Sequence, residues 1–226
     1  MTFQVSSHVG AAIWATSGPA VDDSGNIFVA SGNAFSGGTF DYSNSVIKLS
    51  PTLSLSDWFA PRNWAQLDKG DIDLGSMGPL LLQDGLIFQA GKEGVGYLIE
   101  ASDMGKIGGE AFSTLLGQGA YGGAAYDAPH IFVPTRAGLV ALKVDSTPSF
   151  KVVWSSAQFN AGSPVVAGST VITLDLGSGT LFGFDVDNGE QVFKVVVGGV
   201  MHFTTPALSG GRVVVAAGGR AICLGD

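Results

Sequence analysis

A strand-and-turn pattern that recurs five times along the 226 residues constrains the fold of this chain more than any other feature. Each unit begins with Gly, Ser or Thr followed by Pro or Ala, and a short apolar strand follows seven or eight residues later. A third apolar strand comes next, and turns rich in Gly, Asp and Ser separate the strands as in β-hairpins. The second strands are NIFVAS at 26–31, LIFQAG at 86–91, HIFVPT at 130–135, TVITLD at 170–175 and RVVVAA at 212–217.

Repeated units of four short antiparallel strands, about 40 to 60 residues apart, are typical of a β-propeller. One such blade is too thin to bury both of its faces, so neighbouring blades must stack. We therefore predict an all-β protein with about four complete blades and a partial fifth. A β-sandwich is the alternative, but it does not predict five copies of one hairpin order. The predicted blades span residues 18–77, 78–122, 123–162, 163–204 and 205–226.

The predicted ring is incomplete, because propellers close with about four to eight blades. Either residues 1–17 supply the missing outer strand of the last blade and close a five-bladed ring, or blades are absent before them. The abrupt start of the first unit favours a fragment. We expect part of a ring of about seven or eight blades, with 1–17 as an outer strand or linker of a preceding or closing blade.

Composition excludes several classes of function. Nineteen acidic against eleven basic residues give a net charge of −8, which argues against nucleic acid or an anionic membrane as a partner. The single cysteine, Cys223, allows no intrachain disulfide and no haem attachment motif, and the three histidines lack the spacing of zinc ligands. No apolar run approaches the roughly 20 residues that cross a bilayer. Residues 1–18 lack the features of a secretion signal.

One segment of the repeat carries the resemblance to a known family. LFGFDVDNGEQVF at 181–193 resembles the repeat of the pyrroloquinoline-quinone (PQQ) dehydrogenase-like propellers, in which an aspartate and a turn glycine precede an outer-strand aromatic residue. Asp185, Gly189 and Phe193 take those places. The other units match this repeat less well. The resemblance covers residues 18–226 and implies the propeller fold, with an extracytoplasmic location.

Three positions are similar to functional residues of the quinoprotein alcohol dehydrogenases in that superfamily. The loop GNAFSGGTFDYSNSVIKL at 32–49 implies that Asn33 ligates a calcium ion beneath the quinone. DIDLG at 71–75 implies that Asp73 is the catalytic aspartate and a second calcium ligand. GKEGVGYLIEA at 91–101 implies that Lys92 contacts the quinone carbonyls. The chain departs from that family in having no vicinal cysteine pair and no blade bearing the calcium-binding glutamate.

Strand order predicts that these residues share one end of the propeller, since they all fall in second-to-third-strand loops or in connections between units. A cation such as Lys92 would stabilise the negative charge of a reduced quinone, and we assign Arg136, in an equivalent later loop, as a second cofactor contact. Asp73 would accept the proton of an alcohol substrate, and Asp71 would hold Asp73 or add charge. Gln118, Tyr121, Asn160 and His202 lie in the remaining loops of this kind.

Each of these residues also has a structural interpretation. Asp71 and Asp73 could cap turns by accepting backbone N–H bonds. Asn33 could be a turn residue that tolerates a positive φ, and Lys92 could be a solvated hairpin residue.

The sequence leaves two candidate functions. The first is a non-catalytic propeller that binds a protein or a polymer on one face, as the outer-membrane assembly lipoproteins of the superfamily do. The second is a PQQ- and calcium-dependent dehydrogenase acting on a small alcohol.

Overall fold

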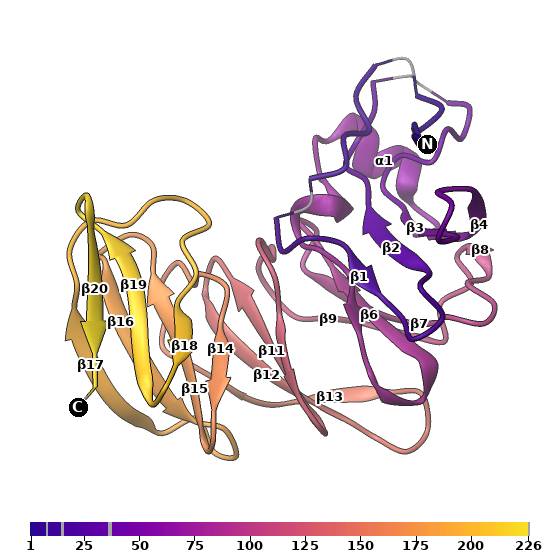
Figure 1. Ribbon diagram of the computed structural model, residues 1–226. Coiled ribbons are helices and arrows are strands. Elements are labelled where there is room, and N and C mark those ends of the chain that lie inside the picture. Colours follow the sequence, from indigo (N-terminus) through magenta and orange to yellow (C-terminus); the bar gives the residue numbers. More distant parts are fainter. Residues whose placement is uncertain (8, 15, 36–37, 226) are drawn as a thin grey trace. The chain divides into compact units, whose positions relative to one another are not determined.

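The computed structural model describes residues 1–7, 9–14, 16–35 and 38–225, and nearly all of its regular structure is β-sheet (Figure 1). The chain divides into two compact units, which are described separately. Unit 1 comprises residues 1–120 and 146–149, and unit 2 comprises residues 121–145 and 150–226. The helices are short and belong to unit 1: α1 (Trp64–Lys69) and the 3₁₀ helices η1 (Leu74–Ser76) and η2 (Gln83–Gly85).

Unit 1 contains two sheets of consecutive antiparallel hairpins. The first has the order β1-β2-β3-β4-β8 and the second the order β5-β6-β7-β9. The innermost strands of the two sheets, β1 and β5, contact each other. The strands of the first sheet are β1 (Ala20–Val21), β2 (Ile27–Ala30), β3 (Val46–Leu49), β4 (Leu55–Ala60) and β8 (Lys106–Ile107). Those of the second sheet are β5 (Leu80–Leu81), β6 (Leu86–Ala90), β7 (Val95–Glu100) and β9 (Phe112–Leu115).

Unit 2 contains three sheets with the same strand order, and their first strands again contact one another in sequence. The first has strands β10 (Ala125–Asp127), β11 (His130–Thr135), β12 (Gly138–Val144) and β13 (Phe150–Ser155). The second has β14 (Val165–Ala167), β15 (Thr170–Asp175), β16 (Thr180–Asp185) and β17 (Gln191–Val196). The third has β18 (Ala207–Ser209), β19 (Arg212–Ala217) and β20 (Arg220–Leu224).

Apolar side chains between neighbouring sheets form the core, as expected of blades that cannot bury both faces alone. In unit 1, Phe28 of β2, Phe59 of β4 and Ile87 of β6 share one cluster, all fully buried. In unit 2, Phe132 of β11 and Phe184 of β16 share another. Second and third strands buried on both faces explain the near-continuous Val, Ile and Phe runs in the sequence.

The outer strands of unit 2 carry an aromatic residue that packs over a small residue of the third strand. Trp154 lies opposite Ala141, and Phe193 lies opposite Gly183, in each case next to a β-bulge. Trp154 also donates its indole N–H to the Val186 carbonyl at 3.0 Å, so it joins two neighbouring sheets. Trp154 therefore packs between two blades.

The sheet β18-β19-β20 has three strands in the described part of the chain. Register places Cys223 of β20 opposite Val214, as Ala141 is opposite Phe132 and Gly183 opposite Ile172 in the preceding sheets. Cys223 therefore occupies the position that Trp154 and Phe193 cover elsewhere, and its side chain is exposed.

The first residues of the chain pack against the first sheet of unit 1. Residues 10 and 13 form isolated bridges to 34 and 31, and Ala11 donates its N–H to the Asn33 carbonyl at 2.6 Å. Val5 and Ala11 are buried in a cluster with Val29 and Ile47. The bridges hold the 31–35 loop, which contributes to the candidate site.

Five elements of unit 1 are absent from the sequence interpretation: α1, η1, η2, β8 and β9. Strand β8 adds to β4 in parallel, because Asp57 of β4 accepts the Met104 N–H at 2.9 Å and forms an ion pair with Lys106. The repeating antiparallel sheets agree with a β-propeller and not with a β-sandwich. No described helix is long and apolar enough to cross a membrane.

Candidate functional site

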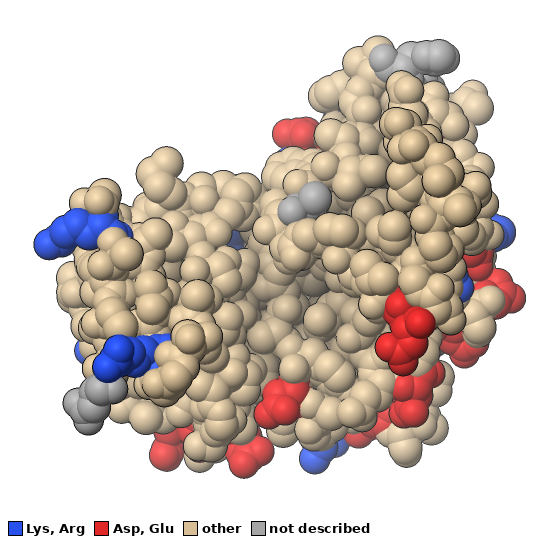
Figure 2. All heavy atoms as spheres, in the orientation of Figure 1, with Lys and Arg blue, Asp and Glu red and all other residues tan. Residues whose placement is uncertain are grey.

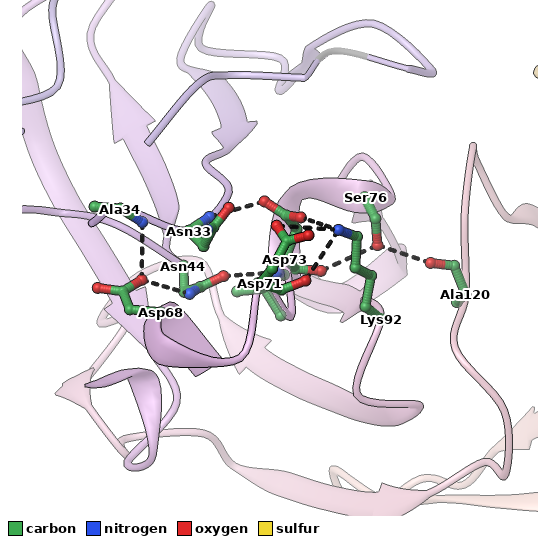
Figure 3. Close-up of polar contacts among 10 residues, drawn as sticks. Asn33, Ala34, Asn44, Asp68, Asp71, Asp73, Ser76, Lys92 and Ala120 are labelled. Atoms are coloured by element: carbon green, nitrogen blue, oxygen red, sulfur yellow. Dashed lines mark hydrogen bonds and ion pairs between the residues drawn. The ribbon is translucent and has the colours of Figure 1, made fainter. Parts of the chain in front are cut away.

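The candidate site of unit 1 forms where the loop after β2, the connection from α1 to β5, and the turn after β6 meet. The loop after β2 brings Asn33, the connection brings Asp71 and Asp73, and the turn brings Lys92. The structure thus brings together four of the five site residues that the sequence singled out (Figure 3). The fifth, Arg136, belongs to unit 2.

Asp73 is the buried centre of this group, with 2% of its surface exposed. Its Oδ1 accepts the backbone N–H of Asn33 at 2.8 Å, and its Oδ2 forms an ion pair with Lys92. Asn33 and Lys92 approach Asp73 from opposite sides in Figure 3. With its amide nitrogen turned toward the carboxylates, the Asn33 side chain also donates to Asp73 at 2.8 Å and to Asp71 at 3.3 Å.

Lys92 connects both aspartates through its ammonium group. Besides Asp73, its Nζ contacts Asp71 Oδ1 at 3.5 Å and donates to the Asp71 carbonyl at 3.0 Å. Its side chain is 18% exposed, and the Nζ lies 5.4 Å from the centre of the Trp14 ring, within cation–π range. Lys92 is therefore a partner of a buried carboxylate rather than a solvated hairpin residue.

Close backbone packing leaves no room for larger residues around Asp73. A Cβ added to Gly32 would collide with Asp73 Oδ1 and lie 2.7 Å from Trp14 Nε1. A Cβ on Gly91 would lie 2.6 Å from the Asp73 carbonyl oxygen. The glycines of the G-N and G-K pairs in the sequence thus let three segments meet around one carboxylate.

A second buried carboxylate, Asp68 of α1, supports the site and was missed by the sequence interpretation. It accepts hydrogen bonds from the Ala34 N–H at 3.0 Å, the Ser43 hydroxyl at 2.9 Å and the Asn44 side chain at 2.8 Å. Burial, and then the negative charge of Asp41, raise the pKa of Asp68. No sequence pattern identifies Asp68, because its partners lie 24 to 34 residues away.

Asn44 links the two carboxylates. It donates to Asp68 and accepts the backbone N–H of Leu74, in η1, at 2.8 Å. Ser76 at the end of η1 donates to the carbonyls of Asp73 at 3.0 Å and Ala120 at 2.8 Å. Asp73 therefore begins a short helix that is held at both ends, and its position is fixed by the surrounding chain.

This donor set fits an ammonium group better than a calcium ion. Calcium takes about six to eight oxygen ligands, whereas here the Lys92 ammonium contacts the carboxylates of both Asp71 and Asp73. Among the described residues, no three His, Cys, Asp or Glu side chains form a metal-binding group. One Asp73 oxygen accepts the Asn33 N–H, and the other forms the ion pair with Lys92.

Arg136 contacts a different set of residues. Its guanidinium carbon lies 4.7 Å from the centre of the Tyr121 ring, at the turn between β11 and β12 in unit 2. Tyr121, Arg136, Asn160 and His202, four of the loop residues noted in the sequence, line one small cavity in that unit. The sequence-predicted residues therefore form one group around Asp73 in unit 1 and a second group around this cavity in unit 2.

Comparison with known proteins supports the fold alone. No family model matches the chain, and no curated protein sequence matches it. BamB from Moraxella catarrhalis has a similar structure, with a TM-score of 0.60 and 12% identity over 88% of this chain and 57% of that one. The designed protein Ika8 has a TM-score of 0.60 and 10% identity over 91% of this chain and 57% of that one.

The designed protein Ika4 has a TM-score of 0.51 and 9% identity over 63% of this chain and 86% of that one. The chain thus spans just over half the length of BamB and Ika8. At these identities the likeness carries no information on activity. The likeness to BamB and the antiparallel sheets confirm the prediction of an all-β β-propeller fold.

Proposed function

We propose that this chain is part of a non-catalytic β-propeller that binds a protein partner through one of its faces, in an extracytoplasmic setting. The observation that supports it most is the ion pair between Asp73 and Lys92. A catalytic base and a quinone-contacting cation must both be available to ligands, and here each neutralises the other. Asn33 and Asp71 complete the same cross-link.

The chemistry of the site supports a structural role for each residue. Buried charges are retained in proteins when they are paired and hydrogen-bonded, as these are. The loop after β2, the end of α1 and the turn after β6 are joined by the Asp73 carboxylate and the Lys92 ammonium. Such a cross-link would hold the loops of one propeller face in a fixed shape, which a binding surface requires.

The test against the alternative, a PQQ-dependent alcohol dehydrogenase, is a titration with PQQ and calcium. We expect no saturable change in quinone absorbance and no dye-linked oxidation of small alcohols. Saturable binding that is lost in Lys92→Ala but kept in Lys69→Ala, a change at an exposed lysine of α1, would overturn the proposal. It would assign the quinone role to Lys92.

A further inference from the structure

A small cavity in unit 2 combines polar groups with no role in the cross-link of unit 1. Its volume is about 60 Å³. Its polar wall is formed by residues from three connections and one turn: Tyr121, Arg136, Asn160, Ser163 and His202, with Phe203 beside them.

Backbone hydrogen bonds hold the walls of this cavity in place. Tyr121 donates its N–H to the Pro134 carbonyl at 3.4 Å, and Ala161 donates to the Thr135 carbonyl at 3.1 Å. Leu176 donates to the Asn160 carbonyl at 2.8 Å. Phe203, whose ring centre lies 3.9 Å from that of His202, has a backbone φ of 67°, in the left-handed region. The backbone that carries these side chains is therefore held by hydrogen bonds, which reduces the entropy cost of binding.

The charge of the cavity is positive. Arg136 is its charged member, and no carboxylate is found among its described lining residues. In the described part of the chain, Arg136 forms no ion pair. The nearby Asp175 is turned to its own loop, since it accepts the Gly177 N–H at 2.9 Å and the Ser178 hydroxyl at 2.6 Å.

The two units differ in net charge. Unit 1 holds five basic and twelve acidic residues, a net charge of −7, and unit 2 holds six basic and seven acidic residues, a net charge of −1. Figure 2 shows a face on which uncharged residues dominate and few basic groups appear. The cavity thus lies in the unit with the smaller net negative charge, and Arg136 is its charged lining residue.

The size and chemistry of the cavity select the ligand group. Small-molecule sites usually have volumes of about 300 to 1,000 Å³, so a cavity of about 60 Å³ admits one functional group and no multi-ring cofactor. A planar guanidinium pairs with a carboxylate through two parallel hydrogen bonds. The Arg136 guanidinium lies over the Tyr121 ring, with its carbon 4.7 Å from the ring centre, and the Asn160 amide adds a neutral hydrogen-bonding group.

We infer that the Arg136 cavity binds one carboxylate group of a protein ligand. The inference names a contact of the proposed protein-binding function and rests on that function for the source of the carboxylate. The source is either a free C-terminus or an Asp or Glu side chain. Arg136 would form the paired hydrogen bonds, with Tyr121 and His202 at the sides of the carboxylate.

Acetate is the first probe. Its binding to the whole chain is monitored by nuclear magnetic resonance of the Arg136 Nε–H and the His202 ring. We expect saturable shifts with a dissociation constant in the millimolar range. Arg136→Gln should weaken acetate binding by about 10-fold or more, since hydrogen bonds to charged groups contribute about 1.5–3 kcal/mol. Arg220→Gln, an equal change of charge on exposed β20 of the same unit, should leave it unchanged.

Acetamide, which has the shape of acetate without its charge, is the matched control ligand. Equal binding of acetamide, unsaturable shifts, or unchanged acetate binding in Arg136→Gln would each overturn the inference. Because Arg136 is exposed, its substitution should not alter folding, and an unchanged melting temperature of Arg136→Gln checks this point.

Short peptides then identify the source of the carboxylate. A peptide with a free C-terminus and no acidic side chain is compared with an amidated peptide that carries one Glu. Binding of either one through Arg136 supports the inference and names the source. If acetate binds through Arg136 but neither peptide does, the carboxylate site stands and its assignment to a protein ligand is overturned. If PQQ and acetate both fail to bind, the carboxylate site fails and the proposed function stands.

Discussion

At the scale of single residues, Asp73 and Lys92 have the greatest effect on unit 1, because a buried charge is stable only beside its partner. Asp73 is 2% exposed, and Lys92 is the cation that contacts it. Removing one member of a buried ion pair costs about 3–5 kcal/mol. The loss is large against the total stability of a protein, about 5–15 kcal/mol.

Lys92→Met should therefore destabilise the protein by about 3–5 kcal/mol, as it leaves the Asp73 carboxylate buried without a counter-charge. Lys69→Met, which removes an exposed lysine from α1, should change stability by less than about 0.5 kcal/mol. Urea unfolding followed by circular dichroism measures both. Equal unfolding midpoints of the two variants would contradict the buried-pair interpretation.

The residues of the site could be predicted from the sequence only in part. Asp73, Lys92 and Asn33 were found because short motifs around them resemble a family, but their contacts with each other are a property of the fold. Asp68 could not be found, since an aspartate within WAQLDK has the appearance of a solvated helix residue. Its burial depends on Ser43 and Asn44, from a loop that is distant in the sequence.

At the scale of secondary-structure elements, the end of α1 explains the position of Asp71. Ile72 donates its N–H to the Leu67 carbonyl at 3.0 Å and Asp71 donates to that of Asp68 at 3.4 Å, the hydrogen bonds of a Schellman motif. Asp71 takes the left-handed position, with φ of 54°, where glycine is usual. In this conformation the Asp71 side chain contacts Lys92, and this contact offsets part of the backbone strain.

Substitutions at Asp71 should separate backbone strain from the ion pair. Asp71→Ala loses the carboxylate and keeps a Cβ in the left-handed region, while Asp71→Gly loses the carboxylate and removes the strain. We expect the glycine variant to be about 1 kcal/mol more stable than the alanine variant. Chemical denaturation measures the difference, and a more stable alanine variant would contradict it.

Strand β8 should detach from β4 at low pH, because Asp57 joins them. Burial raises the pKa of Asp57, but hydrogen bonds from Lys106 and from the N–H groups of Met104 and Trp58 outweigh it and hold the pKa below its ordinary value of 3.8. Such a lowered pKa stabilises the fold above pH 3.8, and this stability is lost as the pH falls through the folded pKa.

Asp57→Asn should thus be less stable than the natural chain near pH 6, and the difference should shrink as the pH falls below 3.8. Unfolding midpoints at pH 6, 4 and 3 test this dependence. Asp23→Asn, at an exposed position in the turn between β1 and β2, is the control and should show no such trend. A difference that grows in acid would contradict the assignment.

Most strands could be predicted because their apolar runs and turn glycines are local signals, as in HIFVPT before its turn at 136–137. The elements that were missed depend on distant contacts. Strand β9 (Phe112–Leu115) has the sequence FSTL with alternate residues exposed, and β8 has two residues, Lys106 and Ile107. Helix α1 is six residues long, and Asn63, although of a type favoured at N-caps, forms no side-chain cap hydrogen bond.

At the scale of the whole molecule, stability depends on how well neighbouring sheets stack. In unit 2, Trp154 of β13 packs against Phe132 and Phe184 and reaches the turn after β16. A Cβ on Gly189, in that turn, would lie 2.6 Å from the Trp154 ring, so the glycine makes room for the indole. One side chain thus couples two blades.

Trp154→Ala should destabilise the protein by about 3–5 kcal/mol, through the cavity and the lost hydrogen bond to Val186. Val153→Ala, a partly exposed position on the same strand, should cost less than about 1 kcal/mol. Hydrogen exchange should show the loss of protection in Trp154→Ala at β13 and β16. Unchanged exchange at β16 would contradict the coupling between the sheets.

The exposed position of Cys223 gives the protein an intrinsic reporter. It is the only thiol in the chain and lies on β20, where the preceding sheets have an aromatic ring over a small residue. Any strand that added to β20 would shield the sulfur from a thiol reagent such as Ellman's reagent. The rate of labelling at one atom would then measure how far that sheet is covered, in the unmodified protein and without an engineered probe.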